Sequence, residues 1–400
     1  MPVNLLRYNR HWEQGFRYPY PKHRALFRQL VSEVETPQII ELSGLRRTGK
    51  TTLLFQLINY LLEQRHNPFA LWYFTFDEEK LPLEELIYIF SQQTGVDFKK
   101  DKIFIFLDEI QKLPNFQNQL KVWYDLYPNL KFFISGSTSL FIKKKTQESL
   151  AGRVKSLFLT PLNFTEYLTF REKEPILERP QAFEREIEQE FEMFLSTQFI
   201  ESMAFPDPYS RREYFVSIIK KIIFEDIPSL FMVGNPEILW QIVRIVAQQP
   251  GMIMDYRSLA SELEMSAKTL SRYLYFLEEA FLVKKLYNFS RNRITSERKL
   301  KRYYLASPSF SRALTDFVDT GRLVENAVVS VKGYQFFWRD PHHHEVDFVA
   351  VEPDESIVPI EVKYRRKIQE KDVKNLLRFA RKFGCSRAIV LRKGVTQNSL

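Results

Sequence analysis

The segment Gly44-Leu45-Arg46-Arg47-Thr48-Gly49-Lys50-Thr51 constrains the fold more than any other feature of the chain. It fits G-x-x-x-x-G-K-[ST], the spacing of a phosphate-binding loop (P-loop). Residues 37–42 predict a short buried strand, and the stretch that begins at Thr52 and runs to residue 62 has the apolar spacing of a helix. A strand, a glycine-rich turn and a helix N-terminus together direct backbone N–H groups and the positive end of the helix dipole at a phosphate. The segment therefore predicts a nucleoside triphosphate site that extends from Gly44 to Thr52.

Two neighbouring acidic residues follow an apolar stretch of the chain after this loop. Residues 102–107 predict a strand that is apolar from Ile103 onward, as is typical of a parallel strand covered on both faces, and Asp108 and Glu109 follow it. Asp108 would hold Mg²⁺ through water or through Thr51, while Lys50 would reach the β- and γ-phosphates. Glu109 would polarise the attacking water as general base. The pair thus predicts the acidic half of a phosphoryl-transfer site.

Two further positions complete the predicted site, and each has an alternative. The strand at residues 131–135 ends in Gly136-Ser137-Thr138-Ser139, and Ser137 or Thr138 would contact the γ-phosphate and the lytic water. A helix N-cap is the alternative role for this cluster. Arg153 follows Gly152 and would supply positive charge to the transition state, in cis or from a neighbouring subunit. Its alternative is an ordinary surface arginine, and a finger in trans would require at least a dimer.

The chain resembles the AAA-type ATPases of prokaryotes in the motifs at residues 44–51, 107–111, 135–137, 149–153 and 159–162. More specifically it resembles the family that carries a C-terminal domain of unknown function, DUF4143. The resemblance implies an AAA+-like core with Walker A, Walker B and sensor 1 elements, and ATP with Mg²⁺ rather than GTP. One position departs from the family pattern, because Ala306 stands where the family has an aspartate.

Composition sets the class of protein. Four hundred residues with 44% hydrophobic and 15% aromatic side chains predict two or three domains with real cores. The single cysteine, Cys385, excludes an internal disulfide framework and a cysteine-rich zinc site. The N-terminus has no apolar signal region, and no run of 18 apolar residues occurs. These features predict a cytoplasmic protein without a membrane partner.

The net charge of +9 is unevenly distributed and points to DNA. Residues 284–302 carry eight Lys and Arg against Glu297 alone. Just before them, residues 256–263 and 267–277 have helix-turn-helix patterning around a turn in which Ser266 is the N-cap. The second helix would present Lys268, Thr269, Ser271 and Arg272, and residues 281–304 would form a basic wing beside it. The alternative is a protein-interaction module.

The last ninety residues hold a second candidate site. Glu325 opens a predicted helix, Asp347 lies on the second strand of a predicted hairpin, and Glu361-Val362-Lys363 ends a further strand. This spacing resembles the PD-(D/E)xK nuclease fold, to which the DUF4143 domain is related. The resemblance implies that Asp347 and Glu361 coordinate Mg²⁺ with the Val362 carbonyl, that Lys363 orients water, and that Glu325 faces the metal. The histidines at 342–344 are expected to form an exposed polar tip.

These observations predict an α/β protein of four parts. Residues 1–165 would form an N-terminal arm and the P-loop ATPase core, 166–250 a helical lid or connector, 251–310 a winged helix-turn-helix, and 311–400 the nuclease-like domain. The leading hypothesis is an ATP-driven switch or motor acting on DNA, which could assemble as a homo-oligomer. The alternative is a signalling or scaffolding ATPase whose C-terminal half docks a protein partner and has no nuclease activity.

Overall fold

The computed structural model describes residues 4–138, 150–292, 296 and 300–394. Ser139, residue 149 and part of the basic wing therefore lie outside the described residues. The chain divides into two compact units, Met1–Thr160 and Pro161–Leu400. Among the described residues, no helix is long and apolar enough to span a bilayer.

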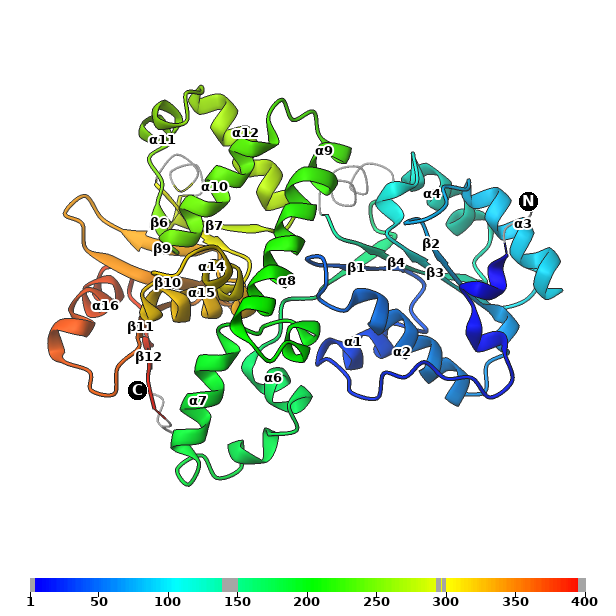
Figure 1. The fold of residues 1–400 in the computed structure, drawn as a ribbon, viewed down its shortest axis with the longest axis horizontal. Helices are drawn as coiled ribbons and strands as arrows, with labels where there is room; N and C mark the ends of the chain where they lie inside the picture. The colour runs from blue at the N-terminus through cyan, green and yellow to red at the C-terminus, as the bar shows by residue number, and fades with distance from the viewer. Residues whose placement is uncertain (1–3, 139–149, 293–295, 297–299, 395–400) are drawn as a thin grey trace. The chain divides into compact units, whose positions relative to one another are not determined.

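Unit 1 is built on a parallel sheet of five strands. Their order across the sheet is β2 (Leu71–Thr75), β3 (Ile103–Asp108), β4 (Leu130–Gly136), β1 (Ile39–Ser43) and β5 (Val154–Phe158). The helices α1 (Leu26–Ser32) and α2 (Lys50–Glu63) lie on one side of it, and α3 (Leu83–Thr94) and α4 (Phe116–Leu126) on the other (Figure 1). Because both faces are covered, every residue of β1, β3 and β4 is buried.

The strand order brings the predicted site together. The strand β4 lies between β1 and β3 and pairs in parallel with both. The P-loop follows β1, the acidic pair ends β3, and residue 137 follows β4. Since the carboxyl ends of parallel strands share one edge of a sheet, all three predicted segments meet there. The strands predicted at residues 37–42, 102–107 and 131–135 and the helix after the P-loop are thus confirmed, whereas β5 was not predicted.

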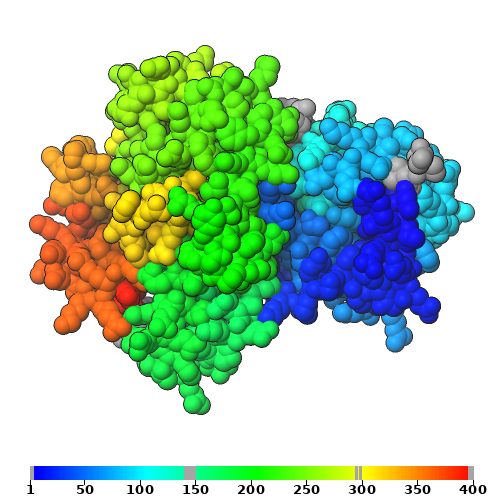
Figure 2. All heavy atoms as spheres, viewed as in Figure 1, coloured from blue at the N-terminus to red at the C-terminus, as the bar shows by residue number. Residues whose placement is uncertain are grey.

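An N-terminal arm protects the edge strand β2. The arm contains the short 3-10 helices η1 (Leu5–Arg7) and η2 (Arg10–Trp12), and it lies on the surface of unit 1, in dark blue in Figure 2. Asn9 accepts from the backbone N–H of Tyr73 at 2.7 Å and donates to its carbonyl at 3.0 Å. His11 and Trp12 contact the Leu71 carbonyl at 2.9 and 3.1 Å. Side chains therefore complete hydrogen bonds that a free sheet edge would leave open.

Unit 2 contains a mixed sheet of seven strands. Their order is β12 (Ile389–Arg392), β11 (Ile357–Lys363), β10 (Glu345–Val351), β9 (Phe336–Arg339), β7 (Val283–Asn288), β8 (Lys301–Leu305) and β6 (Met252–Ile253). Because β7 pairs in parallel with β9, this sheet continues across the domain boundary predicted at residue 310.

The helices of unit 2 surround that sheet (Figure 1). They are α6 (Phe164–Phe170), α7 (Glu184–Phe194), α8 (Pro208–Lys221), α9 (Ile227–Leu230), α10 (Pro236–Gln248), α11 (Tyr256–Glu262), α12 (Ala267–Glu279), α14 (Pro308–Leu314), α15 (Thr320–Lys332) and α16 (Glu370–Phe383). Tyr167 and Phe194, from the segment predicted as a lid, share one apolar cluster with Tyr304 and Phe348 of the sheet. The four-part division stays a prediction. In the structure, packing and strand pairing cross its predicted boundaries.

Short helical turns connect several of these elements. Besides η1 and η2 they are the 3-10 turns η3 (Pro68–Ala70), η4 (Ile110–Lys112), η5 (Glu174–Leu177) and η6 (Ile200–Ala204), and the π-helical turn η7 (Ile222–Asp226). The turn η4 matters most for function, because it begins directly after Glu109 and turns the chain at the end of β3.

Candidate nucleotide site

The P-loop needs glycine at both of its ends. A Cβ on Gly44 would lie 2.5 Å from the carbonyl oxygen of Leu159, closer than any side chain tolerates. Gly49 is the N-cap of α2 with φ of 99°, a left-handed conformation that L-residues rarely adopt. The first glycine therefore lets the loop pass the end of β5, and the second lets it turn into the helix.

Lys50 is held against the loop. Its side chain is buried, and its Nζ donates to the carbonyls of Gly44 at 3.0 Å and Leu45 at 3.1 Å. The Thr48 hydroxyl donates to the same Leu45 carbonyl at 2.8 Å. The ammonium group thus lies inside the curve of the loop, where a P-loop lysine meets phosphate.

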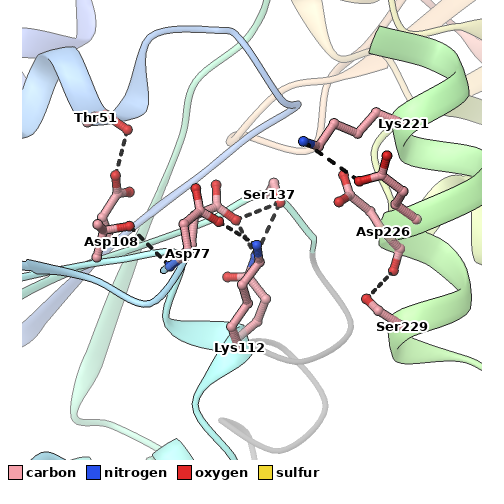
Figure 3. A network of polar contacts seen from close by, with 12 residues as sticks. Thr51, Asp77, Asp108, Lys112, Ser137, Lys221, Asp226 and Ser229 are labelled. Carbon is pink, nitrogen blue, oxygen red and sulfur yellow. Dashed lines mark hydrogen bonds and ion pairs between the residues drawn. The ribbon is translucent and has the colours of Figure 1, made fainter. Parts of the chain in front are cut away.

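Thr51 and Asp108 meet as the sequence predicts. The Thr51 hydroxyl donates to Asp108 Oδ2 at 2.6 Å, a contact drawn in Figure 3. The hydroxyl of Tyr73, on β2, donates to the same Oδ2 at 3.0 Å, and the Ser135 hydroxyl donates to Oδ1. Burial, and then the charge of Asp108, raise the pKa of Tyr73 well above its usual value, which keeps it a donor. The sequence analysis did not identify Tyr73 or Ser135, because their contacts with Asp108 come from neighbouring strands.

Glu109 is held by two side chains. Its φ of 53° turns it out of β3 into η4. Its Oε2 accepts from Gln111 Nε2 at 2.5 Å and from the Ser137 hydroxyl at 3.0 Å, and Gln111 Nε2 lies 3.2 Å from Ser137 Oγ. Burial raises the pKa of Glu109, an effect that the charge of Lys50 partly offsets. A raised pKa makes this carboxylate a stronger proton acceptor near neutral pH.

The two candidates for the sensor position differ in their contacts. Ser137 donates its hydroxyl to Glu109, and Figure 3 labels Ser137 within this polar network. Thr138 Oγ1 is buried and makes no hydrogen bond within the part of the chain that the structure describes. These contacts favour Ser137 as the sensor residue. A helix N-cap would not explain its hydrogen bond to Glu109.

Arg153 lies far from its own P-loop. Its backbone carbonyl accepts from Ile39 at the beginning of β1, whereas the P-loop follows the end of that strand. Its guanidinium forms two bonds to Asp125 of α4, at 2.7 and 3.0 Å. This placement argues against a finger in cis and leaves two alternatives, a finger in trans and an ordinary surface arginine paired with Asp125.

Arg24 ties the P-loop to the end of unit 1. It is buried, and it donates to the carbonyl of Thr48 at 2.9 Å and to that of Thr160 at 2.8 Å. No motif marks this residue in the sequence. Its two contacts connect the phosphate-binding turn with the last residue before unit 2.

The donors at this edge fit a Mg²⁺–nucleotide complex. Mg²⁺ prefers oxygen ligands and takes only one or two from the protein when phosphates supply the others. The Thr51 hydroxyl and the Asp108 carboxylate are such ligands, 2.6 Å apart. Lys50 and the N-terminus of α2 supply positive charge for the phosphates.

The C-terminal candidate residues also come together. Glu325 lies on α15, Asp347 on β10, and Glu361 and Lys363 on β11. Burial first, and the charge of Asp347 second, raise the pKa of both Glu325 and Glu361 to about 7. Asp347 Oδ2 accepts from the Val362 N–H at 2.9 Å, and Lys363 donates to Glu361 at 2.6 Å.

This cluster does not fit the metal that the nuclease resemblance implies. Among the described residues, no group of three His, Cys, Asp or Glu side chains is placed to hold a metal ion. The Val362 N–H, rather than a free carboxylate edge, occupies Asp347 Oδ2, and Lys363 occupies Glu361 Oε1. The predicted ligands are present, and one oxygen of each of these two carboxylates is already hydrogen-bonded, whereas Glu361 Oε2 is buried without a hydrogen-bond partner among the described residues.

The basic wing exposes less charge than its sequence suggests. Lys284 Nζ donates to the carbonyls of Val329 and Ser330 at 3.4 and 3.1 Å, and burial lowers its pKa to about 8. Lys285 pairs with Glu278 at 2.7 Å, and Arg302 is 1% exposed and pairs with Glu345. For these cations the prediction of a phosphate-facing wing is wrong, because strand pairing turns them toward the protein.

The helix pair before the wing keeps its predicted features. Ser266 caps α12 by accepting from the Thr269 N–H at 3.0 Å. Lys268, Ser271 and Arg272 are exposed on α12, whereas Thr269 is partly buried. The strand β6 pairs with β8, and β7 pairs with β8 in the antiparallel sense. The winged-helix interpretation stays a prediction.

Comparisons with known proteins support the motif-based resemblance. Residues 36–168 match the family model of an AAA domain (AAA_14), and residues 320–400 match the domain of unknown function DUF4143. Between them, residues 201–320 match another domain of unknown function, DUF8612, which the sequence analysis did not anticipate. The resemblance to AAA-type proteins and to DUF4143 is thereby confirmed for these segments.

Similar chains occur in distant organisms. The uncharacterized protein MJ1637 of Methanocaldococcus jannaschii is 25% identical, over 94% of this chain and 85% of that protein. An uncharacterized protein of Haemophilus influenzae is 24% identical, over 87% of this chain and 88% of that protein. Among solved structures, Cdc6p from Pyrobaculum aerophilum is similar over 80% of this chain and 98% of its own, with 10% identity and a TM-score of 0.30. AMPPCP-bound DnaA from Aquifex aeolicus is similar over 64% of this chain and 86% of its own, with 14% identity and a TM-score of 0.27.

Proposed function

We propose that the protein is a Mg²⁺-dependent ATPase. One observation carries the proposal: the P-loop lysine, the Thr51–Asp108 pair and the Glu109–Ser137 pair lie at the same edge of one parallel sheet. Phosphoryl transfer needs little covalent chemistry from the protein and depends on positioning and charge, which this set of groups supplies. Thr51 and Asp108 would hold Mg²⁺, which would supply positive charge against the negative charge that develops during transfer.

Each residue has a distinct task in this proposal. Lys50 contacts the β- and γ-phosphates, and Thr51 and Asp108 hold the metal. Glu109 accepts a proton from water, and Gln111 and Ser137 fix the direction of its carboxylate through the contacts at 2.5 and 3.0 Å. Tyr73 and Ser135 hold Asp108 in place.

The test is phosphate release from ATP with Mg²⁺ by the full chain, alongside binding of a fluorescent ATP analogue. We expect Lys50→Ala to abolish both, and Glu109→Gln to bind nucleotide while hydrolysis falls by about 100-fold or more. Glu84→Gln, on the exposed first turn of α3, is the matched control and should behave like the wild type. Hydrolysis unchanged in Glu109→Gln would remove that residue as the base.

Arg153 is proposed to act in trans, in a homo-oligomer. Its place at the opposite end of the sheet from the P-loop supports this assignment. We expect Arg153→Ala and Lys50→Ala to be inactive alone and to regain part of the activity when mixed, because an intact P-loop then meets an intact arginine. No recovery in the mixture, with both variants folded, would contradict the assignment.

For the C-terminal unit we propose DNA as the partner, with ATP turnover as a switch. The exposed cations Lys268 and Arg272 on α12 support this surface, whereas Lys284 does not contribute. Two lost phosphate contacts should make the log–log salt dependence of DNA binding shallower by about 2 in Lys268→Ala/Arg272→Ala. Lys284→Met should leave DNA binding unchanged. If the wild type binds no duplex DNA at low salt, the scaffolding alternative with a protein partner replaces this proposal.

A Mg²⁺-dependent nuclease is the competing function for the residues around Asp347. Cleavage of DNA that requires Mg²⁺ and is lost in Asp347→Ala would establish it. The paired state of Glu361 and Asp347 favours a nuclease-like fold without turnover.

A further inference from the structure

The guanidinium of Arg302 lies among the C-terminal carboxylates. Its side chain is 1% exposed, on β8 between β7 and β6. Its Nη2 forms an ion pair with Glu345, its Nη1 lies 3.8 Å from Asp347 Oδ1, and its Cζ lies 4.8 Å from the centroid of the Phe337 ring. A buried arginine cannot lose its proton to become neutral, so its charge has to be balanced by its neighbours.

A cation lies near each predicted metal ligand, and Asp347 shares Arg302 with Glu345. Arg322 lies 3.0 Å from Glu325, Lys363 lies 2.6 Å from Glu361, and Arg302 lies 3.8 Å from Asp347. A divalent-metal site depends on an excess of carboxylate charge that the ion neutralises. In this cluster Arg322, Lys363 and Arg302 place three positive charges beside the three carboxylates, and Glu361 Oε2 is buried without a hydrogen-bond partner among the described residues.

A metal ion could enter only by displacing Arg302. The guanidinium of Arg302 points toward Asp347, and the ring of Phe337 packs against the guanidinium plane. A divalent ion beside it would meet a fixed positive charge in a buried site, where repulsion is strong. Moving the side chain to solvent would break its ion pair with Glu345.

We propose that Arg302 takes the place of the divalent cation in this site. The C-terminal cluster then binds no metal, and its ion pairs connect β8 with β10. The strand that carries Glu361 and Lys363 keeps the residue types of a nuclease but does not bind the metal that a nuclease needs. The site in unit 1 is the one that binds Mg²⁺ together with nucleotide. This inference is independent of ATP hydrolysis, because it concerns metal binding in the absence of nucleotide.

The experiment measures Mn²⁺ bound per chain, from the loss of the free-ion electron paramagnetic resonance signal, with the full chain and no nucleotide. Every protein carries Lys50→Ala and Asp108→Asn, so that the site in unit 1 does not contribute. In this background, otherwise unchanged protein should bind no Mn²⁺ tightly. Arg302→Met should gain one site per chain, and Arg302→Met/Asp347→Asn should lose it again. Mn²⁺ should also raise the melting temperature of Arg302→Met alone.

Two results would overturn the proposal. One is a tight Mn²⁺ site in the protein with Arg302 intact that disappears in Asp347→Asn, because the arginine would then not exclude the metal. The other is a folded Arg302→Met that gains no Mn²⁺ site. If Arg302→Met does not fold, the comparison between the background protein and its Asp347→Asn variant still decides, since tight binding there refutes the proposal and its absence supports it.

Discussion

Acid should weaken the N-terminal arm through one buried histidine, His11. Its side chain is 1% exposed; Nε2 contacts the Leu71 carbonyl at 2.9 Å and Nδ1 contacts the Tyr18 hydroxyl at 3.0 Å. Burial lowers the pKa of His11 to about 4, although the bond to the Leu71 carbonyl acts in the opposite direction. The neutral ring, which donates from Nε2 and accepts at Nδ1, is therefore the stable form in the folded protein.

The sign and size of the effect follow from linkage. The unfolded chain binds a proton near pH 6.5 and the folded chain only near pH 4, so stability is complete above 6.5 and is lost as the pH falls toward 4. The lowered pKa of His11 contributes at most about 3.4 kcal/mol to the free energy of unfolding, at about 1.36 kcal/mol per pKa unit. About 2 kcal/mol of this contribution is lost between about pH 7 and 5.

Amide hydrogen exchange of β2 in the full chain measures this loss of stability. His11 contacts the first carbonyl of the strand, and exchange reports local opening. After correction for the intrinsic pH dependence of exchange, we expect the opening free energy of Leu71–Thr75 to fall by about 2 kcal/mol from about pH 7 to 5. In His11→Gln, which keeps a donor for Leu71 but cannot be protonated, most of this decrease should vanish. An equal decrease in both proteins would refute the assignment of the effect to His11.

Three further outcomes follow from individual contacts. Asn9→Ala should destabilise unit 1 by about 2–3 kcal/mol, measured by exchange of β2, because both backbone groups of Tyr73 lose a buried partner. Gln111→Leu should lower kcat about 10-fold and move the acidic limb of the pH–rate profile to higher pH, because Glu109 loses an N–H donor that stabilises its charged form. An acidic limb at the same pH as in the wild type would argue against this contact. Ser137→Thr should keep more activity than Ser137→Ala, because the hydroxyl rather than the side-chain volume bonds Glu109.

The sequence was sufficient where local patterns decide the structure. The strands β1 to β4 read as apolar runs because both faces of the sheet are covered, and the motif spacing places Lys50 at the start of α2. Asp108 could be assigned because it ends such a strand. In contrast, β5 carries exposed residues at three of its five positions, so its pattern does not distinguish an edge strand from a loop.

The sequence was insufficient where partners are distant. The count of basic residues in the wing cannot tell which way each side chain points, and Lys284 and Arg302 find their partners on α15 and β10. The same holds for Tyr73, whose hydroxyl reaches Asp108 only because β2 pairs with β3. Residue type and spacing therefore predicted the members of both candidate sites, but not whether those members were already paired.

The two hydrogen bonds of Arg24 connect the candidate nucleotide site with the end of unit 1. A guanidinium is a rigid planar group, so its donors to the Thr48 and Thr160 carbonyls keep a fixed spacing. The Thr48 carbonyl belongs to the phosphate-binding turn, and the Thr160 carbonyl belongs to the last residue before unit 2. Arg24 therefore links the phosphate-binding turn to the last residue of unit 1 through one side chain, and Arg24→Ala would leave the two segments without this link.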